Sequence, residues 1–136
     1  MNADVVEITI AGDPVAQGRG RIVKRGPHFG IADPPKSKEW KQDLKLLAQQ
    51  HAQSPLWDCP VGMDLTVVCQ RPKSAKKAGT YKATKPDLSN YEKGIEDALE
   101  GVIYCNDARI CVKTSRKVFG VAPGIMVRLW KIGEGT

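Results

Sequence analysis

The chain has 136 residues, which is the length of one ordinary domain and enough to bury one core. Hydrophobic residues make up 41% and charged residues 26% of the sequence, and this balance excludes a largely disordered chain. The 21 lysines and arginines outnumber the 15 acids, so the formal net charge is +6. A basic excess of this size favours polyanionic partners such as nucleic acid.

The four cysteines and two histidines show no metal-ligand spacing. No C-x-x-C pair occurs, and His28 and His51 lie far along the chain from every cysteine, so we do not expect a structural zinc site. No apolar run approaches the roughly 20 residues that cross a bilayer, and the first residues lack a signal-peptide pattern. We therefore expect a cytoplasmic protein with reduced thiols, no membrane partner and no small-molecule cofactor.

The first half of the chain predicts a strand, a basic loop, a short strand and a helix. Residues 5–10 are β-branched and partly alternating, and a Gly-Asp-Pro turn follows them. Residues 18–27 are rich in glycine and carry four cations without an acid, which predicts a basic loop. A short strand is expected at 28–32, and apolar residues at helical spacing predict a helix over 37–53.

The second half predicts three strands and one helix. The clearest strand is 63–70, and further strands are expected at 110–119 and 125–132. Residues 71–85 hold six cations and no acid, which predicts a mobile basic loop. Apolar residues at helical spacing predict a helix over 89–100.

This second helix has a start signal and a stop signal. Ser89 and Glu92 have the spacing of a capping box, in which each side chain bonds the backbone N–H of the other residue. Gly101 is expected to end the helix. The elements together predict an α/β (α+β) fold: one domain over residues 1–136, with a mixed four- to five-stranded sheet covered by two helices.

Two aspartates flank this helix at positions suited to chemistry. Asp87 lies just before the helix and Asp107 just before the next strand, so both lie at loop edges held by rigid elements. Cutting a phosphodiester requires the neutralisation of an anion that gains charge, and Mg2+ held by two or three carboxylates provides it. The helix between them is about 18 Å long, and a chain that returns over the sheet can bring the two aspartates together.

The sequence Lys-Pro-Asp-Leu-Ser-Asn at 85–90, with Lys93, Asp-Ala-Leu at 97–99 and Asn-Asp at 106–107, resembles the motif of RusA-like crossover-junction endodeoxyribonucleases. The N-terminal Gly-Asp-Pro-Val and Gly-Arg-Gly-Arg sequences are similar to that family's first strand and arginine-rich turn. The resemblance covers about residues 7–119 and implies the RusA-like fold. It also implies a nuclease that uses Mg2+, or alternatively Mn2+, and that resolves four-way DNA junctions as a homodimer, in a bacterial, phage or prophage context.

Position by position, the resemblance implies that Asp87 and Asp107 are catalytic residues that bind the metal. It also implies that Lys93 is the catalytic lysine, whose cation can stabilise developing phosphate charge. Ser89 stands where the family has a second motif aspartate, and Asn106 stands where an acid commonly precedes the last one. Ser89 can still contact a metal through its hydroxyl in a catalytic role, but it adds no charge, so reduced activity is an open alternative.

Other residues are expected to support this site. Asp97 lies one helical turn after Lys93 and is expected to orient it or to approach the metal from outside. Seven cations are expected to bind DNA phosphates, which makes binding strongly salt-dependent. They are Arg19, Arg21, Lys73, Lys76, Lys77, Lys82 and Lys85.

Plainer interpretations remain open for the same residues. Asp87 can be an acid favoured near a helix start, and Asp107 can be an ordinary turn residue. Ser89 can act only as a helix cap, and Lys93 can be a solvated lysine. The functional alternatives are a catalytically weakened DNA-junction-binding protein of the same fold and, ranked last, a basic RNA-binding domain.

Overall fold

The computed structural model describes residues 3–16, 21–25, 28–32, 35–73 and 80–133, and over 21–39 it describes only the backbone. Its largest element is a four-stranded mixed sheet with the strand order β1-β6-β4-β5. β4 runs antiparallel to β6 and parallel to β5, and β6 runs antiparallel to β1. The strands are β1 (Val5–Ala11), β4 (Val61–Gln70), β5 (Ile110–Gly120) and β6 (Gly124–Lys131).

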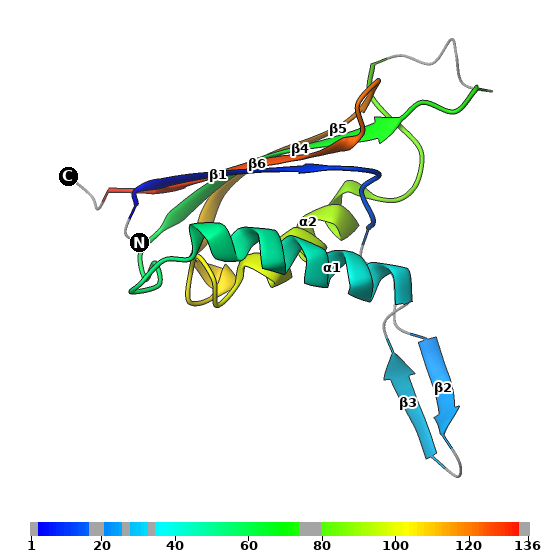
Figure 1. Ribbon diagram of the computed structural model, residues 1–136, viewed down its shortest axis with the longest axis horizontal. Helices are drawn as coiled ribbons and strands as arrows, with labels where there is room; N and C mark the ends of the chain where they lie inside the picture. The colour runs from blue at the N-terminus through cyan, green and yellow to red at the C-terminus, as the bar shows by residue number, and fades with distance from the viewer. Residues whose placement is uncertain (1–2, 17–20, 26–27, 33–34, 74–79, 134–136) are drawn as a thin grey trace.

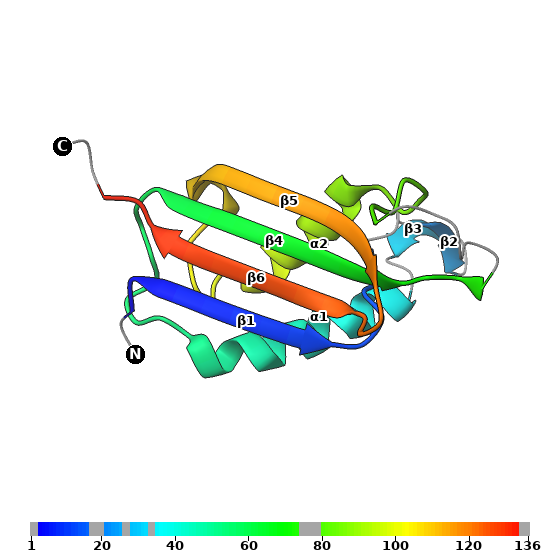
Figure 2. The same cartoon turned by 90° about the horizontal axis from the view of Figure 1, so that it is seen from above.

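Both helices cover one face of this sheet and leave the other face open (Figure 1). α1 (Pro35–Ala48) continues into the short 3-10 helix η1 (Gln49–His51), and α2 (Leu88–Leu99) lies beneath β4 and β5 (Figure 2). A further 3-10 helix, η3 (Asp107–Arg109), leads into β5. The mixed sheet and two helices confirm the predicted α+β architecture. None of the described helices has the length and apolar composition needed to cross a bilayer.

Alternating side chains of the central strand build the core. In β4, Val61, Met63, Leu65 and Val67 are fully buried at every second position, as expected for a strand with one covered face. Side chains of both helices and of the neighbouring strands pack against them. These include Val6, Ile8, Leu44, Ala48, Tyr91, Ile95, Leu99, Ile125, Val127 and Leu129.

The predicted basic loop at 18–27 is wrong in part, because it contains a strand. β2 (Arg21–Arg25) pairs antiparallel with β3 (His28–Ala32), which confirms the short strand expected at 28–32. The hairpin is a separate two-stranded sheet that projects away from the larger sheet and its helices (Figure 1). Flanking glycines suggested a loop, but pairing with the next strand determines the local structure.

The predicted loop at 71–85 is fastened to β5 near its end. Two backbone hydrogen bonds join residues 80–82 to residues 117–119, with N to O distances of 2.8 and 3.0 Å. The edge of β5 offers backbone groups that need partners, and this segment satisfies them. Residues 80–82 at the end of the predicted loop therefore pair with β5.

The capping box expected at the start of α2 does not form. The helix begins one residue earlier than predicted, with Asp87 at the N-cap, so Ser89 lies inside the first turn. The Asp87 carbonyl accepts the N–H of Asn90 at 3.0 Å and closes that turn. Glu92 instead approaches the Lys113 Nζ at 3.5 Å. The expected cap role of Ser89 is wrong, because the backbone turns into the helix at Asp87.

Candidate functional site

Three carboxylates gather where α2 ends. Asp97 comes from the last turns of α2, Glu100 is its C-cap residue, and Asp107 begins η3. One carboxylate oxygen of each residue lies within 4.8 Å of the other two. All three residues are half-buried, and within the described part of the chain none of them pairs with a cation. We call Asp97, Glu100 and Asp107 the acidic cluster.

A tight turn returns the chain from α2 to this cluster. Gly101 has a φ of +79°, a left-handed conformation that ends helices and favours glycine, which confirms the predicted stop. The N–H groups of Val102 and Ile103 both donate to the Leu99 carbonyl, at 3.1 and 3.0 Å. The chain therefore doubles back at the helix end, and Asp107 comes to lie beside residues of α2.

The phenol of Tyr104 is buried, close enough to the acidic cluster to feel its charges. Its Oη donates to the Glu96 carbonyl in the last turn of α2 at 2.6 Å. Burial, followed by the negative charges of Glu96 and of the acidic cluster, raises the Tyr104 pKa above its ordinary value near 10. The phenol stays protonated at neutral pH, so this hydrogen bond keeps the helix end and the returning chain together.

Side chains around Asp107 close a local turn. Asn106 Oδ1 accepts the N–H of Ala108 at 2.8 Å, so this amide caps η3. Arg109 pairs with Asp58 in the segment before β4. Asp107 is therefore held between two anchored residues, and Asn106 has a structural role where the family motif has an acid.

Asp87 lies at the opposite end of α2 from the acidic cluster. Ten residues separate Asp87 from Asp97, which corresponds to about 15 Å along a helix. Asp107 lies with Asp97, so the structure does not bring Asp87 and Asp107 together within one chain. The Asp87 side chain is exposed and makes no cap hydrogen bond, so its carboxylate remains available to a ligand.

Four polar residues, three of them predicted for the site, form a stripe along α2. Spacings of four, four and three residues put them on one face of the helix. They are Ser89, Lys93, Asp97 and Glu100. Ser89 and Lys93 are exposed. A Lys93–Asp97 ion pair does not occur among the described residues, because Asp97 joins the acidic cluster.

The predicted DNA-binding cations are described in part. Lys73 and Lys85 are exposed, whereas Lys82 is half-buried and its Nζ donates to Thr84 Oγ1 at 3.1 Å and to the Lys85 carbonyl at 2.5 Å. Figure 2 shows the β2–β3 hairpin at the same end of the sheet as the start of α2. Arg19, Lys76, Lys77 and the side chain of Arg21 lie outside the described residues.

Glu100 is the cluster member that the motif does not predict, although the sequence contains a signal for it. It follows Asp97 by three residues, a spacing that puts two carboxylates on one helix face.

Two other acids of α2 are neutralised by a lysine of β5: Lys113 Nζ lies 3.5 Å from Glu92 and 3.0 Å from Glu96. Burial lowers the Lys113 pKa, but Glu96 and Glu92 outweigh this effect and raise it, so the ammonium stays charged.

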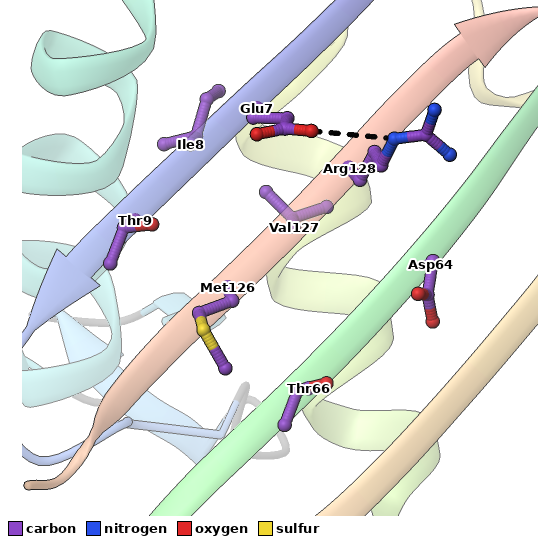
Figure 3. A pocket seen from close by; sticks show the side chains of 8 residues that line it. All are labelled: Glu7, Ile8, Thr9, Asp64, Thr66, Met126, Val127 and Arg128. Atoms are coloured by element: carbon purple, nitrogen blue, oxygen red, sulfur yellow. Dashed lines mark ion pairs between the residues drawn. The ribbon is translucent and has the colours of Figure 1, made fainter.

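A hollow on the open face of the sheet offers no comparable chemistry (Figure 3). Its charges are already paired, since Arg128 lies 3.4 Å from Glu7, and Asp64 pairs at 2.9 Å with Arg116. The hollow also lies on the face of the sheet away from α2, which excludes it from the site described above. Its lining consists of Glu7, Ile8, Thr9, Asp64, Thr66, Met126, Val127 and Arg128.

Residues 11–130 match the family described as endodeoxyribonuclease RusA, a range that includes Asp87, Lys93 and the acidic cluster. The chain belongs to the RusA family. It is also similar to the uncharacterized protein YqaN of Bacillus subtilis (strain 168), with 35% identity over 139 residues that cover 95% of this chain and 98% of that protein. Membership of the RusA family confirms the predicted fold and supports an endodeoxyribonuclease activity.

Proposed function

We propose that this RusA-family protein is a Mg2+-dependent endonuclease that resolves four-way DNA junctions by paired, symmetric phosphodiester cuts. The observation that carries the proposal is the acidic cluster, whose three half-buried carboxylates have no cation partner among the described residues. Like charges at this spacing repel one another. A bound cation is the simplest physical reason for such an arrangement in a family of DNA-cutting enzymes.

The donor set of the acidic cluster fits a hard divalent cation. Mg2+ prefers oxygen ligands, keeps several waters and needs few protein carboxylates, and Mn2+ accepts the same donors. When bound, such an ion supplies charge neutralisation at the scissile phosphate and activation of water. The protein holds the carboxylates in place through Tyr104 and the η3 turn, so little reorganisation is required on binding.

We infer that Asp87 completes this centre across a homodimer. Both α2 and β5 run between Asp87 and the acidic cluster: β5 begins just after Asp107, and Lys117 near its other end contacts the Pro86 carbonyl. A two-fold axis that passes beside the midpoints of α2 and β5 would place an antiparallel copy of each element in the partner subunit. Asp87 of one subunit would then lie beside Asp107 of the partner subunit, and a two-fold junction would receive two symmetric cuts.

The outer edge of β5 suits such a contact. β5 is an edge strand, and residues 110–116 pair with β4 alone among the described strands. Val112 on this stretch is 49% exposed. Strand edges with unpaired backbone groups readily pair with another chain. Antiparallel contact between two β5 edges around Val112 would join the subunits in the required orientation.

Lys93 and the basic segments have roles at the phosphates. Lys93 lies on the exposed stripe of α2 between Asp87 and the acidic cluster, where its ammonium can stabilise charge that develops on a phosphate. Lys85 in the turn before α2 and Lys73 beyond the end of β4 are exposed, and both can hold the phosphates of the junction arms. The same role remains a prediction for Arg19, Arg21, Lys76, Lys77 and Lys82. A cytoplasmic location also remains a prediction.

The test mixes two inactive subunits. Asp87→Asn and Asp107→Asn carry different tags, are expressed together, and are purified as the mixed dimer. If the centre is shared, one of its two sites keeps Asp87 from one subunit and Asp107 from the other, so the mixed dimer nicks a labelled junction while each homodimer is inactive. If each chain holds a whole site, both sites of the mixed dimer are damaged and no nick appears. Full activity of the Asp87→Asn homodimer would remove Asp87 from the site.

The competing function is a DNA-junction-binding protein with weakened chemistry. Ser89 favours it, because this exposed residue in the first turn of α2 adds no charge where the family motif has an aspartate. Incubation of a labelled junction with and without metal separates the two functions. Tight binding with no product at any Mg2+ or Mn2+ concentration would support the binding protein, and preference for RNA would support the RNA-binding alternative.

A further inference from the structure

Lys117 fastens the turn before α2 to strand β5. Its Nζ donates to the carbonyl oxygens of Thr84 and Pro86, at 2.6 and 2.5 Å. Its own main-chain oxygen accepts the N–H of Lys82 at 3.0 Å. One residue of β5 therefore holds this turn through both side chain and backbone, although 31 to 33 residues of sequence separate Lys117 from the two carbonyls.

A second lysine completes this set of carbonyl contacts. Lys82 Nζ donates to the Lys85 carbonyl at 2.5 Å and to Thr84 Oγ1 at 3.1 Å. Three successive carbonyl groups, those of Thr84, Lys85 and Pro86, thus accept hydrogen bonds from ammonium groups. Hydrogen bonds with an ionised donor are shorter and stronger than neutral ones. They fix the direction of the backbone as it enters α2.

The next residue is Asp87, and its backbone is fixed on both sides. It is extended, with φ −66° and ψ 144°, and its carbonyl accepts the N–H of Asn90 in the first turn of α2. Its carboxylate is exposed and makes no cap hydrogen bond. We propose that Lys117 is a positioning residue, which sets where the Asp87 carboxylate lies by holding the carbonyls of Thr84 and Pro86. The consequence for metal binding rests on the proposed function, whereas the fastening of the turn does not.

Lys117 is poorly suited to a direct phosphate contact. Two of its three N–H donors are used on carbonyl groups, and the residue is half-buried. Lys85 lies in the same turn, is exposed, and its Nζ makes no contact within the described part of the chain. Lys85 therefore provides a matched control, because its removal takes away a cation near Asp87 without removing a carbonyl contact.

The experiment compares Lys117→Met, Lys117→Arg and Lys85→Met in the full-length protein. Amide hydrogen exchange over residues 87–91 reports whether the start of α2 is held. Mg2+ titration of the melting temperature reports metal binding, and junction affinity in EDTA reports phosphate contacts. In Lys117→Met we expect exchange to rise by about tenfold and the Mg2+ half-saturation to rise by about fivefold, with junction affinity within about twofold of wild type. In Lys117→Arg, which again supplies N–H donors, we expect wild-type hydrogen exchange and wild-type Mg2+ binding. In Lys85→Met we expect weaker junction binding alone.

Wild-type exchange in Lys117→Met would overturn the proposal. So would a profile that matches Lys85→Met, since Lys117 would then be a phosphate contact. The Asp87→Asn variant separates this result from the proposed function. If Asp87→Asn leaves Mg2+ binding unchanged, Asp87 is not a metal ligand and the shared centre fails, while the exchange measurement still decides whether Lys117 holds the turn.

Discussion

Replacing Asp107 with Asn is expected to stabilise the protein in the absence of metal and to destabilise it in the presence of metal. The carboxylate oxygens of the acidic cluster lie within 4.8 Å of one another, and two unit charges at this distance repel by about 0.9 kcal/mol in bulk water. Asp107 takes part in two of the three pairs, so its neutralisation removes about 2 kcal/mol of repulsion at low salt. A loss of about 0.3 kcal/mol at the start of the short η3 helix opposes this gain.

The net gain of about 1.5 kcal/mol corresponds to a rise of about 5 °C in Tm for a chain of this length. Mg2+ reverses the order of the two proteins. At a metal concentration 100 times the Kd, binding stabilises the wild type by about 2.7 kcal/mol, and the variant loses most of this stabilisation. Bound metal also removes the repulsion in the wild type. Asp107→Asn should therefore melt above the wild type in EDTA and below it in Mg2+.

Differential scanning calorimetry at one protein concentration and low ionic strength, with EDTA or Mg2+, measures this exchange. Asp43→Asn is the control, because it removes an exposed carboxylate of α1 that does not belong to the acidic cluster. A lower Tm of Asp107→Asn than of the wild type in EDTA, or an equal rise in Asp43→Asn, would exclude charge repulsion within the acidic cluster as the cause. Unchanged Mg2+ stabilisation in the Asp107→Asn variant would separately exclude the acidic cluster as the metal site.

Three further predictions concern single residues. Ser89→Asp restores the motif carboxylate and should tighten Mg2+ binding by about tenfold, or about 1.4 kcal/mol, with cutting equal to or faster than wild type; slower cutting would contradict this. Tyr104→Phe removes the hydrogen bond to the Glu96 carbonyl and should cost about 1 kcal/mol, or about 3.5 °C in Tm. The pKa of Tyr104 is higher in the folded protein than its ordinary value of 10. The free energy of unfolding of the wild type should therefore be constant below about pH 10 and fall as the pH rises further. Denaturant titrations should show a smaller fall in Tyr104→Phe. Gly101→Ala should cost about 1 kcal/mol because of its positive φ, whereas Gly133→Ala, with open space around it, should leave Tm unchanged.

Local patterns predicted the strands and helices well because neighbours along the chain determine them. Alternation in β4 follows from one covered face of a sheet, and the end of α2 at Gly101 follows from the conformational freedom of glycine. The same local rules failed where a distant segment competes. The strand β2 forms because β3 pairs with it, and the cap of α2 lies at Asp87 because the turn before it is held on β5.

The sequence alone therefore determined the family and the order of the main elements, since these depend on motif and periodicity, and it supplied the candidate residues for the site. It could indicate that Asp87 and Asp107 matter, but it could not indicate how far apart they lie. Only the tertiary structure decided that Asp107 meets Asp97 and Glu100 while Asp87 lies at the other end of α2. The physical reason is that a straight helix separates its ends by its full length, and contacts such as that of Lys117 with Pro86 join residues 31 positions apart.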